Sequence, residues 1–208
     1  MKERPIIFNA EMVNAILSGR KTQTRRVIQS PAKSMQANGM QVIEYREAGD
    51  KWYGDHVFSM RGSSGTWHDY TKEQFLAKCP FGEIGDRLWV RETWARYNID
   101  QYSHDMAYRA TTPDDWPKGG LWRQSNHMPR WASRITLEIT GVRVERLNSI
   151  SDADVKVEGY PAEREAGGGR YDAWLWYRSL WESIYGEESW QANPWVWVIE
   201  FKRVDNEA

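Results

Sequence analysis

The side chains best suited to chemistry lie in a polar segment from Gly19 to Arg26, where four basic residues and two hydroxyl groups follow a predicted helix. Lys21 and Thr24 are three positions apart within it. On an ideal strand that spacing directs two side chains to opposite faces, whereas a turn leaving a helix can direct both into one pocket. The segment is therefore either an anion or nucleotide site, if it forms a turn, or a solvated basic loop.

Further side chains could contact a phosphate or a base. Arg25 and Arg26 belong to the same basic segment, and Arg91 lies on a predicted strand. A guanidinium binds phosphate or a base edge well, although Arg91 stands beside Glu92 and could form a structural ion pair instead. Trp89 could stack on a nucleobase, but tryptophan on a strand more often covers or fills a sheet.

Metal and cofactor chemistry has little support in the sequence. No histidines or cysteines have ligand-type spacing, and lone histidines on loops usually face solvent. The run from Gly167 to Gly169 lacks the preceding strand and the inner spacing of a dinucleotide-binding loop, so we interpret it as a flexible linker. We therefore expect no metal and no cofactor. The side chains that could otherwise have been metal ligands are those of His56, His68, His104, His127 and Cys79.

The composition favours a local rather than a general affinity for anions. The 208 residues include 29 acidic and 28 basic ones, so overall charge would not attract long nucleic acid. Cys79 is the sole cysteine, which excludes an internal disulfide and indicates a reducing compartment. Since no apolar run has the length of a membrane span or a secretory signal, we expect a cytoplasmic protein without membrane contact. Most of the 13 tryptophans should be buried.

The elements around the basic segment can be predicted from local signals. A short strand at residues 5–8 leads into a helix that Asn9 can cap and Gly19 can end. Val13 and Ile16 would give this helix one buried face.

Two later segments have the patterns of core strands. Residues 86–94 alternate as a half-buried strand does, with Leu88 and Val90 on one face. In residues 134–146 the apolar positions change parity at Gly141, which predicts a β-bulge or bend there and suits a curled sheet.

Two long polar stretches are predicted to be insertions. The first, at about residues 30–84, has strand candidates at 40–45 and 51–60 joined by a turn at 47–50, which we interpret as a hairpin. The second, at about residues 98–130, is rich in proline and glycine and has one possible strand at 106–110.

The C-terminal region should contribute two helices and a closing strand. Ser151 can cap a short helix reciprocally with Asp154, and Gly159 can end it. A longer amphipathic helix would be capped by Asp172 and end at Gly186. The last strand follows with four apolar residues on one face: Trp195, Trp197, Ile199 and Phe201.

Together these elements predict an α+β fold. Several short, mostly antiparallel strands, one of them strongly bent, would form a small, partly open barrel that hides its strand edges, with short helices in the connections. We expect one domain over residues 1–208.

The chain resembles the ASCH family, which has a PUA-like barrel, in four blocks that occur in the family's order and span well under half of the sequence. The insertions between the blocks resemble those of longer ASCH-type proteins of bacteria, phages and prophages. The blocks are Gly19–Arg25, Gly85–Glu92, Arg134–Gly159 and Trp197–Phe201.

This resemblance implies a cleft for RNA or a modified nucleoside. Compact bacterial members of the family hydrolyse N4-acetylcytidine with a Lys and a Thr of the turn and a Glu of the helix, which correspond to Lys21, Thr24 and Glu158. Such a set suffices for amide cleavage, because a nucleophile, a base and an acid for the leaving amine are needed. Lys21 can be the base only if its pKa is lowered, and otherwise it would stabilise the oxyanion.

Three functions remain open at this level. The chain could be an amidohydrolase of N4-acylated cytosine nucleosides, a non-catalytic PUA-like protein that binds RNA, or a phage-related interaction protein with the barrel as a scaffold. The sequence leaves open the physiological substrate, the oligomeric state and the role of the two insertions. For Glu158 the alternative is an ordinary helix-end carboxylate in water.

Overall fold

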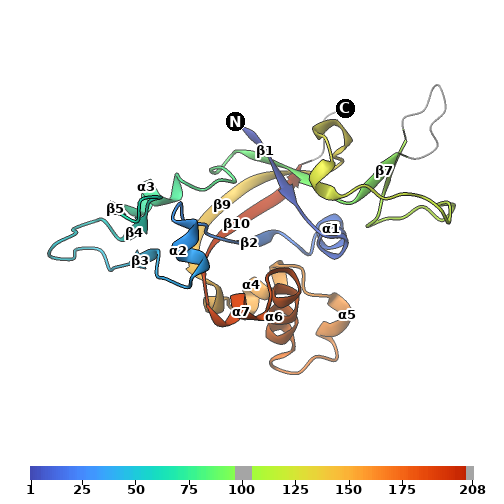
Figure 1. The fold of residues 1–208 in the computed structure, drawn as a ribbon. Coiled ribbons are helices and arrows are strands. Elements are labelled where there is room, and N and C mark those ends of the chain that lie inside the picture. Colours follow the sequence, from blue (N-terminus) through green and yellow to red (C-terminus); the bar gives the residue numbers. More distant parts are fainter. Residues whose placement is uncertain (97–104, 205–208) are drawn as a thin grey trace.

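A five-stranded sheet, built from strands at both ends of the chain, forms the centre of the fold (Figure 1). The computed structural model describes residues 1–96 and 105–204. The strand order is β1-β6-β9-β10-β2, with β1 and β6 parallel and the other neighbours antiparallel. The strands are β1 (Glu3–Ile7), β2 (Gln23–Val27), β6 (Arg87–Arg91), β9 (Thr136–Arg146) and β10 (Trp195–Val204).

The predicted irregularity in β9 is present. Glu200 pairs with Gly141 and Phe201 with Ile139, so the register between β9 and β10 shifts by one residue at this point. The shift lets Ile139 and Val142 contact the same hydrophobic core despite their opposite parity in the sequence. The two long strands are visibly curved in Figure 1, as a bulge in mid-strand favours.

Residues 196–199 of strand β10 are buried on both faces. Trp197 and Ile199 belong to the main core, which also includes Leu88 and Val90 of β6. Val196 and Val198 point the other way, into a second core formed with the C-terminal helices, whose members include Leu147, Val155, Tyr177, Trp181 and Trp190. The face of the last strand predicted from the sequence is therefore correct, although Val196 and Val198 on its opposite face are buried as well.

The expected barrel is not closed in the described part of the chain. β1 and β2 lie at opposite ends of the strand order, and no hydrogen-bonded ladder joins them. Side chains partly bridge the gap: the Arg26 guanidinium donates to the backbone carbonyl of Ile7 at 2.6 Å and lies over the ring of Phe8, 5.1 Å from its centroid. The architecture is thus an α+β fold with an open, curled sheet.

The helices around this sheet pack on both of its faces: Val13 and Ile16 of the first helix belong to the main core, whereas the C-terminal helices form the second core. Asn9 caps the first helix by accepting from the N–H of Met12 at 2.9 Å, as predicted. Asp172 is not the cap of the longest helix, as the sequence suggested; Tyr171 occupies that position, and the Asp172 carboxylate instead accepts from Arg164 at 2.8 Å. The helices of this region are α1 (Ala10–Leu17), α4 (Asp152–Val157), α5 (Ala162–Glu165), α6 (Asp172–Tyr185) and α7 (Glu187–Gln191).

The first insertion is more elaborate than the predicted hairpin. It forms a three-stranded antiparallel sheet, and its middle strand begins at Phe58 rather than at residue 51, because the residues before it form turns. Phe75 of the insertion stacks on Trp197 of the central sheet, with ring centroids 5.5 Å apart, so the insertion shares the main core. Its elements are α2 (Lys33–Ala37), β3 (Ile43–Tyr45), β4 (Phe58–Arg61), β5 (Trp67–Tyr70) and α3 (Lys72–Leu76).

The second insertion projects from the opposite side of the sheet in Figure 1. Its strands β7 (Trp94–Arg96) and β8 (Met106–Tyr108) pair with each other, so the strand predicted at 106–110 is present but shorter. Short 3-10 turns at Ser125–His127 and Arg130–Ala132 follow, and a third, Leu147–Ser149, comes after β9. Residues 98–104 of the predicted insertion, including His104, lie outside the described residues.

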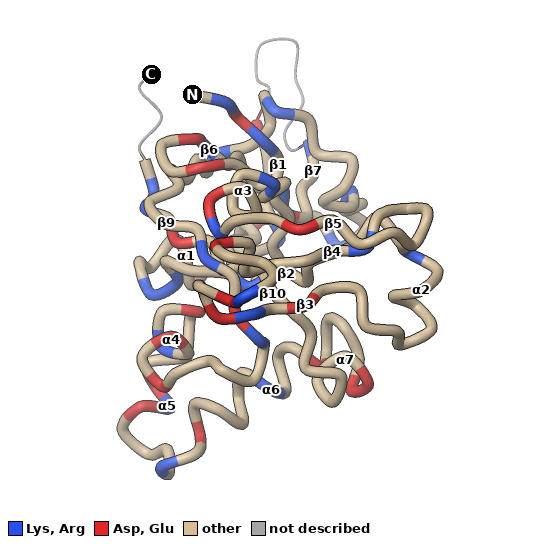
Figure 2. The backbone as a smooth tube through the Cα atoms, turned by 90° about the vertical axis from the view of Figure 1, so that its left-hand side faces the viewer, with Lys and Arg blue, Asp and Glu red and all other residues tan. Residues whose placement is uncertain are grey.

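Acidic and basic residues are interspersed along the backbone, as Figure 2 shows. Within residues 1–96 and 105–204, no helix combines the length and the apolar character that a bilayer crossing requires.

Candidate functional site

Lys21 is placed by the way the chain leaves α1. Gly19 adopts a positive φ of 76°, a conformation that favours glycine, and so allows a sharp exit from the helix. The backbone N–H of Lys21 then donates to Ala15 of α1 at 3.0 Å, and Lys21 forms an isolated antiparallel bridge with Glu158. The turn ends at this point, and Thr24 already lies on β2, so the prediction that one turn holds both residues is wrong.

Glu158 is placed by α4, which has the predicted capping box. The Ser151 hydroxyl accepts from the N–H of Asp154 at 3.1 Å, and Glu158 follows the last helical residue at the other end. Gly159 then leaves the helix with a φ of +109°, and a Cβ atom on it would lie 2.9 Å from the Cβ of Ala15. A side chain at residue 159 would thus prevent the close approach of the two segments.

Lys21 and Glu158 form a buried ion pair. The Lys21 ammonium donates to the Glu158 Oε2 at 2.7 Å and to its backbone carbonyl at 2.9 Å. Their side chains are only 0% and 3% exposed. Burial lowers the pKa of Lys21 below its usual value of 10.5, and the contact with Glu158 opposes this shift only in part. The lowered pKa brings the neutral amine, which can accept a proton, closer to the physiological range.

Arg25 is the second partner of Glu158. Its guanidinium donates to the Glu158 Oε1 at 3.0 Å and to the Glu145 Oε2 at 3.0 Å, and it lies 3.5 Å from the Asp154 carboxylate. The Arg25 side chain has no solvent exposure. Both oxygens of the Glu158 carboxylate are thus bound to cations, which fixes the orientation of the group.

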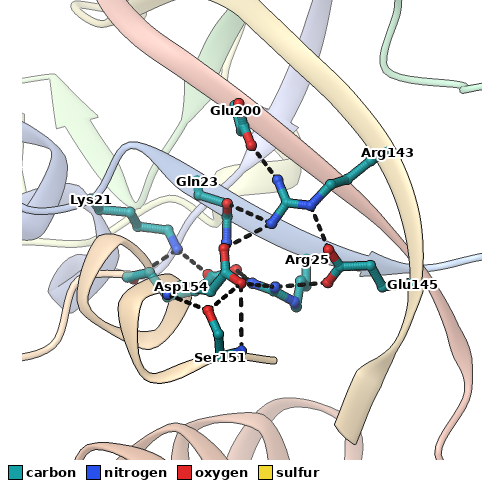
Figure 3. A network of polar contacts seen from close by, with 9 residues as sticks. Lys21, Gln23, Arg25, Arg143, Glu145, Ser151, Asp154 and Glu200 are labelled. Atoms are coloured by element: carbon teal, nitrogen blue, oxygen red, sulfur yellow. Dashed lines mark hydrogen bonds and ion pairs between the residues drawn. The ribbon is translucent and has the colours of Figure 1, made fainter. Parts of the chain in front are cut away.

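The network continues on the solvent side through Arg143 (Figure 3). This guanidinium donates to Asp154 at 2.7 Å and to the side-chain carbonyl of Gln23 at 3.1 Å, and it also contacts Glu145 and Glu200. Residues from β2, α4, β9 and β10 therefore share one chain of charged contacts.

Thr24 lies next to the ion pair, in a small cavity. Within the described part of the chain, β2 has a strand neighbour only on the β10 side. A cavity of about 20 Å³ is lined by three successive residues of β2, Thr24 to Arg26, together with Glu158 and Tyr177. A cavity of this size can hold about one water molecule. Among the described residues the Thr24 hydroxyl has no hydrogen-bond partner.

Tyr177 is a site residue that sequence analysis missed. The sequence pattern indicates only an amphipathic helix in this region, yet the Tyr177 hydroxyl is buried and has no hydrogen-bond partner among the described residues. Burial raises the pKa of this phenol well above 10, and the negative charge of Glu158 raises it further. The hydroxyl therefore keeps its proton and can donate a hydrogen bond into the cavity. Periodicity alone could not separate this tyrosine from its apolar neighbours.

Arg91 and Trp89 are not part of this cluster. Both lie on β6, which β9 and β10 separate from β2 in the sheet. The Arg91 guanidinium lies over the Trp89 ring, 4.8 Å from its centroid, and the ring is buried, so its role is mainly packing. Glu92, the alternative partner considered for Arg91, pairs instead with Arg134 at 2.9 Å.

Nothing in the described residues resembles a metal centre. Within residues 1–96 and 105–204 no group of three or more His, Cys, Asp or Glu side chains is arranged to hold an ion.

No protein-family model matches the chain, and no curated protein does. The solved structures that are similar to it include two that we describe. The crystal structure of an ASCH domain from Lactobacillus crispatus JV V101 has a TM-score of 0.42 and 12% identity, covering 97% of this chain and 79% of that one. A protein from Enterococcus faecalis V583, described by the family model DUF984, has a TM-score of 0.38 and 11% identity, covering 92% of this chain and 66% of that one.

Proposed function

We propose that this chain is an ASCH-type amidohydrolase that removes the acyl group from N4-acylated cytosine nucleosides such as N4-acetylcytidine. The proposal depends on one observation: the buried Lys21 ammonium lies 2.7 Å from Glu158, and Glu158 and Thr24 line the same small cavity. The sequence blocks that resemble the ASCH family include all three residues.

In the proposed reaction a water held by the Thr24 hydroxyl attacks the acyl carbon. The neutral amine of Lys21 takes the proton of that water, and the C–N4 bond then breaks as the proton passes to N4. The products are a free cytosine amine and a carboxylate. Glu158 acts as a positioning residue for Lys21, and Tyr177 can donate to the oxygen on which negative charge develops.

Access to the cavity requires movement of the side chains that cover it. A space for about one water cannot take an acyl group, and Leu180, Ile184 and Tyr185 of α6 also line the cavity. Ile184 and Tyr185 are 44% and 36% exposed, so they can rotate into solvent without leaving a buried core. The substrate would enter along the free edge of β2.

Binding without catalysis is the second candidate, and a specific observation favours it. Glu158 is paired with two cations, which would also serve a purely structural purpose, since a buried carboxylate needs such partners. In that case the site would bind a nucleoside or RNA but would not hydrolyse an acyl group from it.

The decisive experiment is incubation of the protein with N4-acetylcytidine and measurement of cytidine by chromatography. Thr24→Val removes the hydroxyl at nearly constant volume and should lower kcat/KM by about 10²-fold or more. Lys21→Met should abolish turnover. Because the loss of one partner of a buried ion pair can lower the free energy of unfolding by about 3–5 kcal/mol, the folding of this variant must be checked by circular dichroism. Lys156→Ala, at an exposed lysine on α4, is the matched control. No cytidine release by the wild-type protein, or equal release by a folded Lys21→Met, would overturn the proposal.

A further inference from the structure

A larger hollow lies beside the site, under the first insertion. Its volume is about 640 Å³, within the usual range for small-molecule pockets. It shares Arg26 and Tyr185 with the small cavity that holds Thr24 and Glu158. One wall comes from the central sheet and the others from α2, β5 and the segment after α3, so the first insertion supplies much of the lining.

The charge of this hollow is of one sign. Arg26, Lys33 and Lys78 line it, and no Asp or Glu is among the described residues of its lining. Neither Lys33 nor Lys78 forms an ion pair with any residue the structure describes, whereas Lys21 and Arg25 nearby are fully compensated. The hollow therefore offers an uncompensated positive potential to an anionic ligand.

Aromatic rings line the same hollow. Tyr70 and Phe81 are half-buried and Tyr185 is 36% exposed, while the buried ring of Trp197 also lines the hollow. The Lys78 ammonium lies 4.4 Å from the centroid of the Tyr70 ring, which places a cation directly beside an aromatic surface. Partly exposed rings next to unpaired cations are the combination that binds a planar base and its phosphate.

We propose that this hollow binds a phosphorylated nucleoside, with the base against the aromatic rings and the phosphate at Lys33 and Lys78. Because the hollow meets the small cavity at Arg26 and Tyr185, the substrate class of the proposed hydrolase becomes acylated cytosine carrying a phosphate, either as a free nucleotide or within RNA. The hydrolysis of such a substrate rests on the proposed function, whereas the binding of a phosphorylated nucleoside in the hollow does not.

The test is a binding titration by calorimetry with cytidine, cytidine 5′-monophosphate and a short single-stranded RNA that carries a 5′-phosphate. The monophosphate should bind about tenfold or more tightly than cytidine, as expected for charge-assisted contacts. The variant Lys33→Ala/Lys78→Ala should lose this preference while its affinity for cytidine stays unchanged. Lys51→Ala/Lys118→Ala removes the same charge at exposed lysines outside the hollow and should retain the preference.

The outcomes separate the two proposals. Equal affinity for cytidine and its monophosphate, or an equal loss in both double variants, would overturn the phosphate site. A lysine-dependent preference for the monophosphate, together with no hydrolysis of N4-acetylcytidine or of its 5′-monophosphate, would support the hollow and remove the proposed enzyme. RNA binding much tighter than that of the monophosphate would support the hollow and identify nucleic acid as the source of the phosphate.

Discussion

The Lys21 side chain has no exposure to solvent, and among the described residues its ammonium group pairs with one carboxylate, that of Glu158. Desolvation favours its neutral form, while the carboxylate favours the charged one, and the balance lowers the pKa. This competition decides whether the residue can act as a base.

The pH dependence of the reaction tests that role. Since the active form of Lys21 would be the neutral amine, log kcat/KM should rise with pH and level off above the lowered pKa, before the usual value of 10.5 is reached. The measurement is kcat/KM for N4-acetylcytidine as a function of pH in the wild-type protein. A rate that falls steadily between about pH 6 and about pH 10 would exclude Lys21 as the base.

Tyr177→Phe separates a catalytic from a structural hydroxyl. The phenol has no hydrogen-bond partner among the described residues, so its removal should change the free energy of unfolding by less than about 1 kcal/mol. If the hydroxyl stabilises the oxyanion, kcat should fall by about tenfold or more while thermal stability is kept. An unchanged kcat would show that the hydroxyl does not contact the reacting atoms.

Between elements, the close contact of α1 and α4 brings Lys21 and Glu158 together. Gly159→Ala should disturb it, because residue 159 has a φ of +109° and an added Cβ would lie 2.9 Å from Ala15. We expect a loss of about 1–2 kcal/mol in unfolding free energy together with reduced turnover. Gly167→Ala is the matched control, since a Cβ there would meet nothing within 4 Å. Equal effects of the two substitutions would contradict this account.

Asp86 links the start of β6 to the start of β1. Its carboxylate accepts from the N–H of Lys2 at 2.7 Å and from Arg4 at 2.7 Å, and these contacts, the backbone donor first, lower its pKa from 3.8 to about 2. The stabilisation is therefore complete above about pH 4 and is lost as the pH falls through about 2.

Urea unfolding of Asp86→Asn can measure this contribution. The difference in midpoint between this variant and the wild-type protein should be large near neutral pH and should shrink toward pH 2. Asp55→Asn, at an exposed carboxylate, serves as the control. A difference that does not change with pH would show that the ionised form of Asp86 is not what stabilises the β1–β6 pair.

For the whole molecule, the first insertion and the central sheet share one core. Phe75 is fully buried and stacks on Phe58, with centroids 4.4 Å apart, and on Trp197. Phe75→Ala should lower the free energy of unfolding by about 3–5 kcal/mol. Both the wild-type protein and the variant should unfold in one cooperative thermal transition, as a single domain requires. Trp52→Ala, at a ring that is 81% exposed, should have little effect. Two separate transitions in the wild-type protein would instead define the insertion as a unit of its own.

Local sequence patterns were enough to predict the elements that depend on near neighbours. The Asn9 cap, the Ser151–Asp154 capping box, the end of α1 at Gly19 and the irregularity in β9 are local, because each is set by residues within a few positions of one another. The same holds for the apolar face of β10. These features were predictable without coordinates.

The contacts between distant segments could not be predicted in this way and became visible in the folded chain. The pairing of Arg25 with Glu158, 133 positions apart, the unpartnered hydroxyl of Tyr177 and the hollow beside Arg26 all depend on packing between elements. The same is true of the open sheet, since closure depends on the distance between β1 and β2 rather than on either strand. Local patterns contain no information on such distances, because long-range contacts arise only when the chain buries its apolar faces together.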